Sequence, residues 1–101
     1  MGRIEVSLYD PAEYITTEED VVLHLEAAFE DGDPGVISDV IGAVARSQGM
    51  ADIATKTGLS RESLYRALSP KGNPKLSTLV EVLAALGLRL SVVLLVEVAE
   101  A

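Results

Sequence analysis

The stretch MADIATKTGLSRESLYRAL, residues 50–68, decides the fold because its spacing fits two short helices joined by a tight turn. Gly58 closes the first helix and can adopt the positive φ that such a turn requires. Ser60 is the expected N-cap of the second helix, so the turn contains only Gly58, Leu59 and Ser60. A helix-turn-helix motif joins its helices by a turn of about this length, often with glycine in it. The sequence therefore predicts a helix-turn-helix at 50–68.

Successive residues of an α-helix are related by a rotation of about 100° about the axis, and this geometry places the apolar and polar residues of the stretch on opposite sides. The side chains expected between the two helices are Ile53, Ala54, Leu59, Leu64 and either Ala67 or Leu68. The outward side of the second helix carries Arg61, Glu62, Tyr65 and Ser69, with Arg66 at its edge. The outward side is polar enough to enter a DNA groove.

Individual residues on the outward side suit particular DNA contacts. Arg61 lies at the start of the helix, where it can reach guanine O6 and N7, and Tyr65 can contact a base or a phosphate. Contacts to phosphates fix orientation and make binding depend on salt. The residues expected to make them are Ser60, Ser63, Arg66, Lys71 and Lys75. With Glu62, which shares the outward side, these eight residues form the predicted DNA-binding set.

Charge is unevenly distributed along the chain, whose formal net charge is −8 at pH 7. Residues 1–40 contain one base and eleven acids, a net charge of −10, and should repel nucleic acid. Residues 56–75 contain five bases and one acid, a net charge of +4. A surface that faces phosphates needs this positive charge, whereas a plain solvated two-helix corner does not. The contrast favours DNA binding.

Three further helices are expected around the motif. In the first, Thr16 pairs with Glu19 as a capping box, and a break follows at Asp31-Gly32-Asp33. Its apolar stripe comprises Val21, Val22, Leu25 and Phe29. Pro34 can occupy the first turn of the next helix, which should end near Gly49. The inward residues of that helix are Ile37, Val40, Ile41, Val44 and Ala45.

The last predicted helix begins at Ser77 or nearby, after a loop with two prolines and a glycine at residues 70–74, and ends at Gly87. Its inward residues are Leu79, Val80, Val82, Leu83 and Leu86. The prediction is thus a mainly α domain of five helices at 16–87, preceded by a strand or arm at 1–15 and followed by a strand at 88–98.

Both terminal strands are predicted from alternation of apolar and polar residues. Ile4, Val6 and Leu8 alternate with polar residues, while residues 88–98 are apolar on one face and, through Val93 and Leu95, partly apolar on the other. A lone strand leaves its backbone groups unpaired, so the two should pair with each other or with a second copy. The two-sided apolar segment indicates an interface, and we expect a homodimer built partly on it.

Composition narrows the class of protein. With 101 residues the chain has room for one compact domain, and its 4% aromatic content calls for an aliphatic core. The absence of cysteine excludes disulfides and thiolate chemistry and suits a reducing cytoplasm. MGRIEVSLYD lacks the apolar core of a signal peptide, and the longest apolar run, 88–98, is too short for a membrane span of about 20 residues.

Residues for catalysis or metal binding are scarce. His24 is the only histidine and lies inside a predicted helix, where a packing role is expected. The spacing of Asp31, Asp33 and Asp39 lacks the ligand order of a calcium loop, and the chain has no P-loop or dinucleotide-binding glycine pattern. We therefore expect no enzyme activity, no cofactor and no metal.

Two blocks of the sequence resemble a known family. YDPAEYITTEEDVVLHLEAAFEDGDP and GMADIATKTGLSRESLYRALSPKGNPKLSTLVEVLAALGL are similar, in residues and in spacing, to the addiction-module antidote proteins, HigA-like antitoxins of bacterial toxin–antitoxin operons. The resemblance covers about residues 9 to 92. It implies a lambda-repressor-like DNA-binding fold, a small RelE/ParE/HigB-type toxin encoded by a neighbouring gene as partner, and repression of the operon's own promoter.

Several alternatives stay open at this point. The acids of the first forty residues would complement a basic toxin, but ordinary solvated helix faces would carry the same acids. The function could be that of an antitoxin that also represses its operon, of a stand-alone repressor without a toxin, or of a protein-interaction module that has lost DNA binding. The operator and the toxin-contacting residues do not follow from the sequence.

Overall fold

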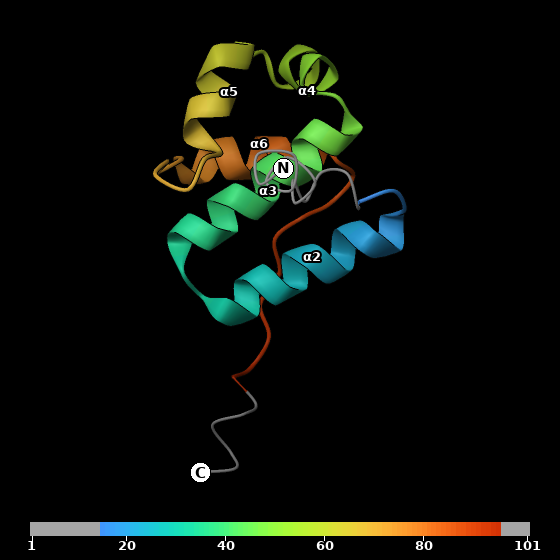
Figure 1. Ribbon diagram of the computed structural model, residues 1–101, viewed down its shortest axis with the longest axis vertical. Coiled ribbons are helices and arrows are strands. Elements are labelled where there is room, and N and C mark those ends of the chain that lie inside the picture. Colours follow the sequence, from blue (N-terminus) through green and yellow to red (C-terminus); the bar gives the residue numbers. More distant parts are fainter. Residues whose placement is uncertain (1–14, 96–101) are drawn as a thin grey trace, which may run out of the picture.

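The computed structural model describes residues 15–95, and five helices form the body of this range (Figure 1). In chain order they are α2 (Glu18–Asp31), α3 (Pro34–Gln48), α4 (Met50–Thr57), α5 (Arg61–Ala67) and α6 (Leu76–Ala85). No strand occurs within this range, so the part of the chain that the structure describes is all-helical. The prediction of five helices is confirmed.

The strand predicted at 88–98 is not formed by residues 88–95, which have no regular secondary structure. A strand needs a neighbouring backbone for its hydrogen bonds, and the remainder of the described range is helical or irregular. The side chains concerned are strongly exposed, at 92% for Val92, 85% for Val93 and Leu94, and 73% for Leu95. The strand predicted around Ile4, Val6 and Leu8, and residues 96–98, lie outside the described residues.

The start of α2 is a capping box shifted by one residue from the prediction. The Thr17 hydroxyl accepts a hydrogen bond from the Asp20 backbone N–H at 3.0 Å, and the Asp20 carboxylate accepts one from the Thr17 N–H at 3.1 Å. TTEED contains the same spacing twice, as Thr16 with Glu19 and as Thr17 with Asp20. The second pair prevails because Asp20 also accepts from the Thr16 N–H and hydroxyl. These hydrogen bonds, led by that of the Thr16 backbone, lower the pKa of the Asp20 carboxyl below its ordinary value.

Most other helix ends lie where the sequence predicts them. Gly32 and Gly58 end α2 and α4 in the left-handed conformation, with φ of 81° and 77°. Pro34 occupies the first turn of α3, as predicted. Helix α6 begins at Leu76, next to the predicted Ser77, and its N-cap residue Lys75 makes no side-chain cap. Residues 75–77 are exposed, so water can satisfy the free N–H groups of this first turn.

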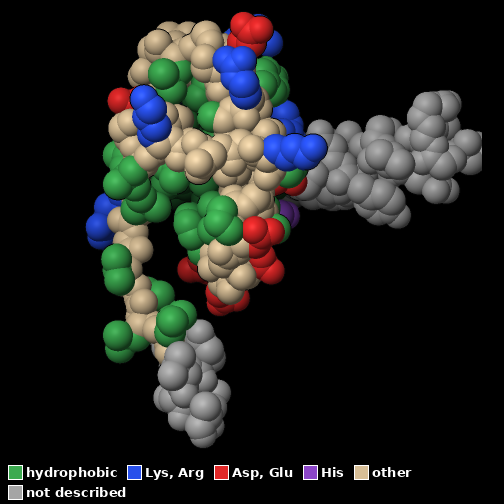
Figure 2. Space-filling model, turned by 90° about the vertical axis from the view of Figure 1, so that its left-hand side faces the viewer, with side chains coloured by type: hydrophobic (Ala, Val, Ile, Leu, Met, Phe, Trp, Pro, Cys, Tyr) green, Lys and Arg blue, Asp and Glu red, His purple; other side chains and the backbone are tan. Residues whose placement is uncertain are grey.

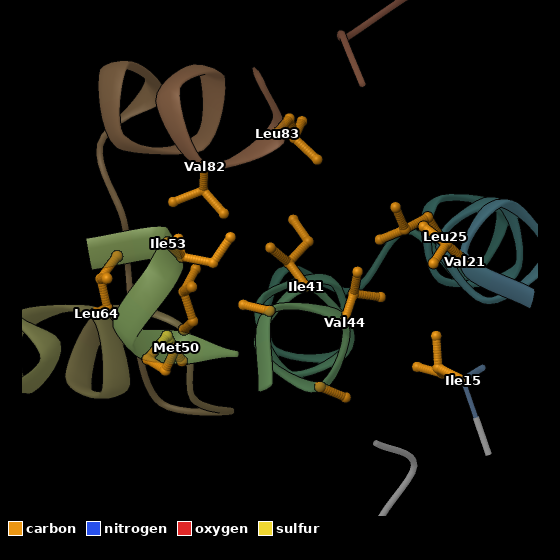
Figure 3. Close-up of a cluster of buried hydrophobic side chains, with 13 residues drawn as sticks. Ile15, Val21, Leu25, Ile41, Val44, Met50, Ile53, Leu64, Val82 and Leu83 are labelled. Carbon is orange, nitrogen blue, oxygen red and sulfur yellow. The ribbon is translucent and has the colours of Figure 1, made fainter. Parts of the chain in front are cut away.

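Helix α3 lies at the centre of the core. Figure 3 shows Ile41 and Val44 of α3 between Val21 and Leu25 of α2 on one side and the side chains of α4 and α5 on the other. Both α3 residues are fully buried, and α3 packs against α2, α4 and α5. The other large buried side chains of the cluster are Ile15, Met50, Ile53, Leu64, Leu68, Val82 and Leu83. Removing each from water contributes about 1.5–3 kcal/mol.

Three residues predicted to face the core are instead substantially exposed. Val22 and Phe29 of α2 are 42% and 44% exposed, and Val80 of α6 is 49% exposed. In their place on α2, Ala28 is buried beside the line of Val21 and Leu25. The apolar stripe of α2 is wider than the face that α3 covers, because α2 packs on one side of the molecule only.

Two glycines allow α3 to approach the end of α5 and the loop after it. A Cβ added to Gly42 would collide with the backbone carbonyl oxygen of Leu68, the C-cap residue of α5. A Cβ on Gly35 would lie 2.7 Å from the carbonyl oxygen of Pro70. The absence of side chains at these two positions therefore fixes where α5 sits on α3.

This contact predicts an unusual sign for one substitution. Replacing glycine by alanine inside a helix ordinarily stabilises a protein by about 0.5–1 kcal/mol. Because the methyl group of Gly42→Ala would meet the Leu68 carbonyl, we expect the free energy of unfolding to fall by about 1–3 kcal/mol instead. Urea denaturation followed by circular dichroism measures it, and increased stability would show that α5 can move away without cost.

Candidate nucleic-acid interface

The turn between α4 and α5 is held by its own hydrogen bonds. The Gly58 N–H donates to the Ala54 carbonyl at 2.9 Å, which completes the last turn of α4. The Thr57 hydroxyl donates to the Ile53 carbonyl at 2.9 Å and accepts from the Leu59 N–H at 3.2 Å. Thr57 thus links the end of α4 to the turn, a role that the sequence analysis missed although a threonine directly before a turn glycine is a signal for it.

The inner side of this helical corner is as predicted. Ile53 and Leu64 are 1% exposed and Leu68 is 2% exposed, while Ala54 and Leu59 pack at the edge of the same cluster. Met50 at the start of α4 is also buried, which the sequence analysis had not singled out. These contacts join α4 and α5 into one unit that rests on α3 and α6.

The outer side carries the eight residues of the predicted set at the surface. Seven are exposed and Ser63 is half-buried. Ser60 to Arg66 belong to α5 or its cap, and Lys71 and Lys75 lie in the loop from α5 to α6. The Gly72 N–H donates to the Ser69 carbonyl at 2.9 Å, and a Cβ on Gly72 would collide with the Ala67 carbonyl. This close return of the loop brings Lys71 beside the last turn of α5, whereas Lys75 lies further along, at the start of α6.

The hydroxyl of Ser60 has a structural role at the start of α5. It accepts a hydrogen bond from the Ser63 N–H at 3.0 Å and donates one to the Ser63 hydroxyl at 2.8 Å. It is therefore the N-cap that the sequence predicts. The same bonds fix the backbone on which Arg61 is carried.

The corner and the following loop have a positive surface. Within residues 15–95 the ion pair at the corner joins Lys56 to Asp52 at 3.2 Å, with both side chains more than half exposed, so it contributes little to stability. In the same range no carboxylate pairs with Arg61, Arg66, Lys71 or Lys75. Figure 2 shows lysine and arginine side chains over the upper part of the molecule and most of the acids over the lower part. The arrangement can attract a polyanion to the corner.

Other kinds of site find no support in residues 15–95. No group of three or more histidine, aspartate or glutamate side chains there could hold a metal ion. His24, the residue considered for catalysis, has its Nδ1 atom 2.7 Å from the Asp20 carbonyl oxygen in the preceding turn of its own helix. Among these residues, no helix has the length and apolar character needed to cross a bilayer.

The fold and the site together define the described part of the chain as an all-helical domain with a basic corner at its surface. Comparison with known families is more specific, since residues 5–94 match the family described as "Probable addiction module antidote protein". The chain belongs to this family, as the resemblance predicts, and membership implies a role in a toxin–antitoxin system with a toxin as partner. Antidotes of this kind are typically not enzymes.

A relative supports this assignment. The chain is 39% identical over 84 residues to an uncharacterized protein of Haemophilus influenzae (strain ATCC 51907 / DSM 11121 / KW20 / Rd). The alignment covers 83% of this chain and 87% of the relative. No solved structure matches the chain. The assignment to the family therefore depends on sequence comparison, whereas the geometry of the corner is known from the present structure.

The cap of α5 generates a prediction about stability. Ser60→Ala removes the acceptor for the Ser63 N–H, and we expect the free energy of unfolding to fall by about 1 kcal/mol. Ser63→Ala is the matched control, because it removes a hydroxyl of the same pair and keeps the capped N–H. Urea denaturation of both variants checks the difference. Equal losses would mean that the hydroxyl pair, not the cap, stabilises the start of α5.

Proposed function

We propose that this protein is the antitoxin of a type II toxin–antitoxin module. It neutralises a small RelE/ParE/HigB-like toxin by direct binding and represses its own operon through a sequence-specific helix-turn-helix. One observation carries the DNA-binding part: α5 presents a basic outer face, without carboxylate partners in residues 15–95, in a chain of net charge −8. Family membership supports the toxin-binding part.

In the proposed complex α5 enters the major groove of operator DNA. Arg61, at the first position of the helix, reaches the O6 and N7 atoms of a guanine, and Tyr65, one turn further on and 45% exposed, contacts a base or phosphate. The phosphate contacts come from the rest of the set, namely Ser60, Ser63, Arg66, Lys71 and Lys75. Glu62 shares this face, where its charge disfavours phosphate and favours a base that donates a hydrogen bond.

The active form is proposed to be a homodimer that joins through the segment at 88–98. Residues Val92 to Leu95 expose four consecutive apolar side chains and carry backbone groups that no strand partner within residues 15–95 engages. A second copy can cover both at once. Two-fold pairing would also place two α5 helices for half-sites about one DNA turn, or a multiple of it, apart.

A stand-alone repressor is the alternative with the same DNA contacts and no toxin. Membership of the antidote family favours the antitoxin over it. A small basic reading frame beside the gene separates the two, and co-purification of the chain with that gene product tests the choice directly. A protein-interaction module without DNA binding differs from both, because it would not shift the mobility of the upstream DNA.

The proposed role of Arg61 predicts a change in both affinity and sequence preference. Arg61→Ala should weaken binding to the operator by about 1–3 kcal/mol and relax the preference at one base position. Lys71→Gln should instead weaken binding to all sequences alike and reduce the slope of log affinity against log salt by about 1. Fluorescence anisotropy with the upstream DNA and single-base variants measures both effects.

The control for these variants is Glu81→Gln, which removes one exposed charge on α6, outside both the predicted DNA-binding set and the proposed dimer segment. It should leave the sequence preference unchanged and the salt slope within error of the wild type. An Arg61→Ala variant with the affinity and preference of the wild type would remove Arg61 from the proposed readout.

The proposed dimer predicts a mass of twice that of the 10.7 kDa chain in light scattering at micromolar concentration. Val93→Asp should shift the equilibrium towards monomer, because the carboxylate would have to be desolvated in the interface, and Val93 is too exposed for the change to affect the helical core. Unchanged thermal unfolding of the α-helices is the control. A wild-type monomer under these conditions would contradict dimerisation through this segment.

A further inference from the structure

An apolar groove runs between the outer face of α2 and the segment 88–95. Its floor and walls include Val22 and Phe29 from α2 and Leu88 and Leu90 from the segment. Glu26 and Glu30 of α2 line the same groove and are exposed. In Figure 2 the hydrophobic side chains of this lower part of the molecule lie directly beside the acidic ones. Arg89 of the segment also lines the groove. The groove is thus apolar inside, with two acids on the edge formed by α2 and one base on the edge formed by the segment.

The acids of α2 are placed unfavourably for an isolated helix. Glu26 and Glu30 are four residues apart, and like charges at this spacing destabilise a helix. Glu30 and Asp31 lie in the last turn, which contains no basic residue, so they face the negative end of the helix dipole. Within residues 15–95 none of the three has a basic partner. Local conflicts of this kind are expected where a binding surface has been selected over stability.

The charge decides between two occupants of the groove. A second copy of the chain would bring one base to the rim, Arg89 of its own segment, together with an excess of acids elsewhere, since α2 has no lysine or arginine and the whole chain has a net charge of −8. A partner with lysine or arginine around an apolar side chain would neutralise the rim and fill the floor in one step. The conflicts at Glu30 and Asp31 would be relieved by the same partner.

We infer that the part of the groove between α2 and residues 88–90 is the docking site for the toxin, which inserts a basic amphipathic segment there, while Val92 to Leu95 belong to the proposed dimer contact. An apolar side chain of the toxin covers Val22 and Phe29, and its lysine or arginine residues contact Glu26 and Glu30. The inference rests on the proposed antitoxin function. Toxin and DNA can be bound together, because α2 and α5 lie on opposite sides of α3 (Figure 1).

The test uses the full chain and the purified product of the neighbouring toxin gene. The main variant is Glu26→Lys with Glu30→Lys, which reverses the charge of the rim and leaves the core unchanged because both side chains are exposed. We expect it to bind the toxin about tenfold or more weakly in calorimetry, and to bind operator DNA no more weakly than the wild type. Its melting temperature should be equal or higher, since the dipole and repulsion conflicts are removed.

Two further variants separate the floor from the rim and control for charge. Phe29→Ala shortens an apolar side chain that is 44% exposed and should also weaken toxin binding while the helices melt as in the wild type. Glu81→Lys, an exposed charge reversal on α6, is the control and should bind the toxin as the wild type does.

Each failure has its own meaning. If the wild-type chain does not bind the toxin, both the proposed antitoxin function and the proposed docking site are contradicted. If the wild type binds and the Glu26→Lys, Glu30→Lys variant binds equally well, only the docking site is overturned. Loss of the dimer mass in that variant, with toxin binding retained, would assign the groove to a second copy and would equally overturn the inference.

Discussion

The close approach of α3 to the end of α5 is the constraint on which the rest of the structure depends. Gly42 leaves room for the Leu68 carbonyl, and Leu64 and Leu68 then reach the core that Ile41 shares with the other helices. A bulkier residue than glycine would separate the helices, and the turn at Gly58 would no longer rest on a fixed base. This contact sets the orientation of the outer face of α5. Because α5 has only seven residues and its inner side is closely packed, the helix cannot rotate without disturbing that packing.

Opposite charges are kept at opposite ends of the helical body. α5 and its following loop carry four bases and one acid, α2 carries six acids and no base, and α3 lies between them. In so small a domain a mixed surface would weaken the attraction of both kinds of partner. The unfavourably placed acids at the end of α2 and the wide apolar stripe that leaves Val22 and Phe29 exposed have a common explanation if α2 is a binding surface. One helix can then meet the core with one face and a partner protein with the other.

Sequence reasoning predicts this fold well where single residues determine the backbone. Gly32, Pro34 and Gly58 mark helix ends by their own φ preferences, and these ends are confirmed. It is less successful where one pattern fits two residue pairs, as in TTEED, which could form the capping box at either threonine. It also fails where burial depends on which helix covers a face, as for Val80, which is exposed. Periodicity also predicts a strand at 88–98, but pairing requires a partner that the described part of a single chain lacks. The site residues follow from spacing; their DNA contacts remain a prediction.

The internal hydrogen bonds of the α4–α5 corner have a consequence for how such modules diverge. Thr57 and Ser60 complete the turn and the cap, and Ile53 and Leu64 fill the interior. The side chains of Arg61 and Tyr65 belong neither to these hydrogen bonds nor to the buried cluster. Substitutions at these two exposed positions therefore cost about 0.5 kcal/mol or less in stability. If Arg61 and Tyr65 have the proposed role, single substitutions there can change the operator that is recognised while the protein stays folded. Related modules in one genome could then lose the ability to bind one another's operators.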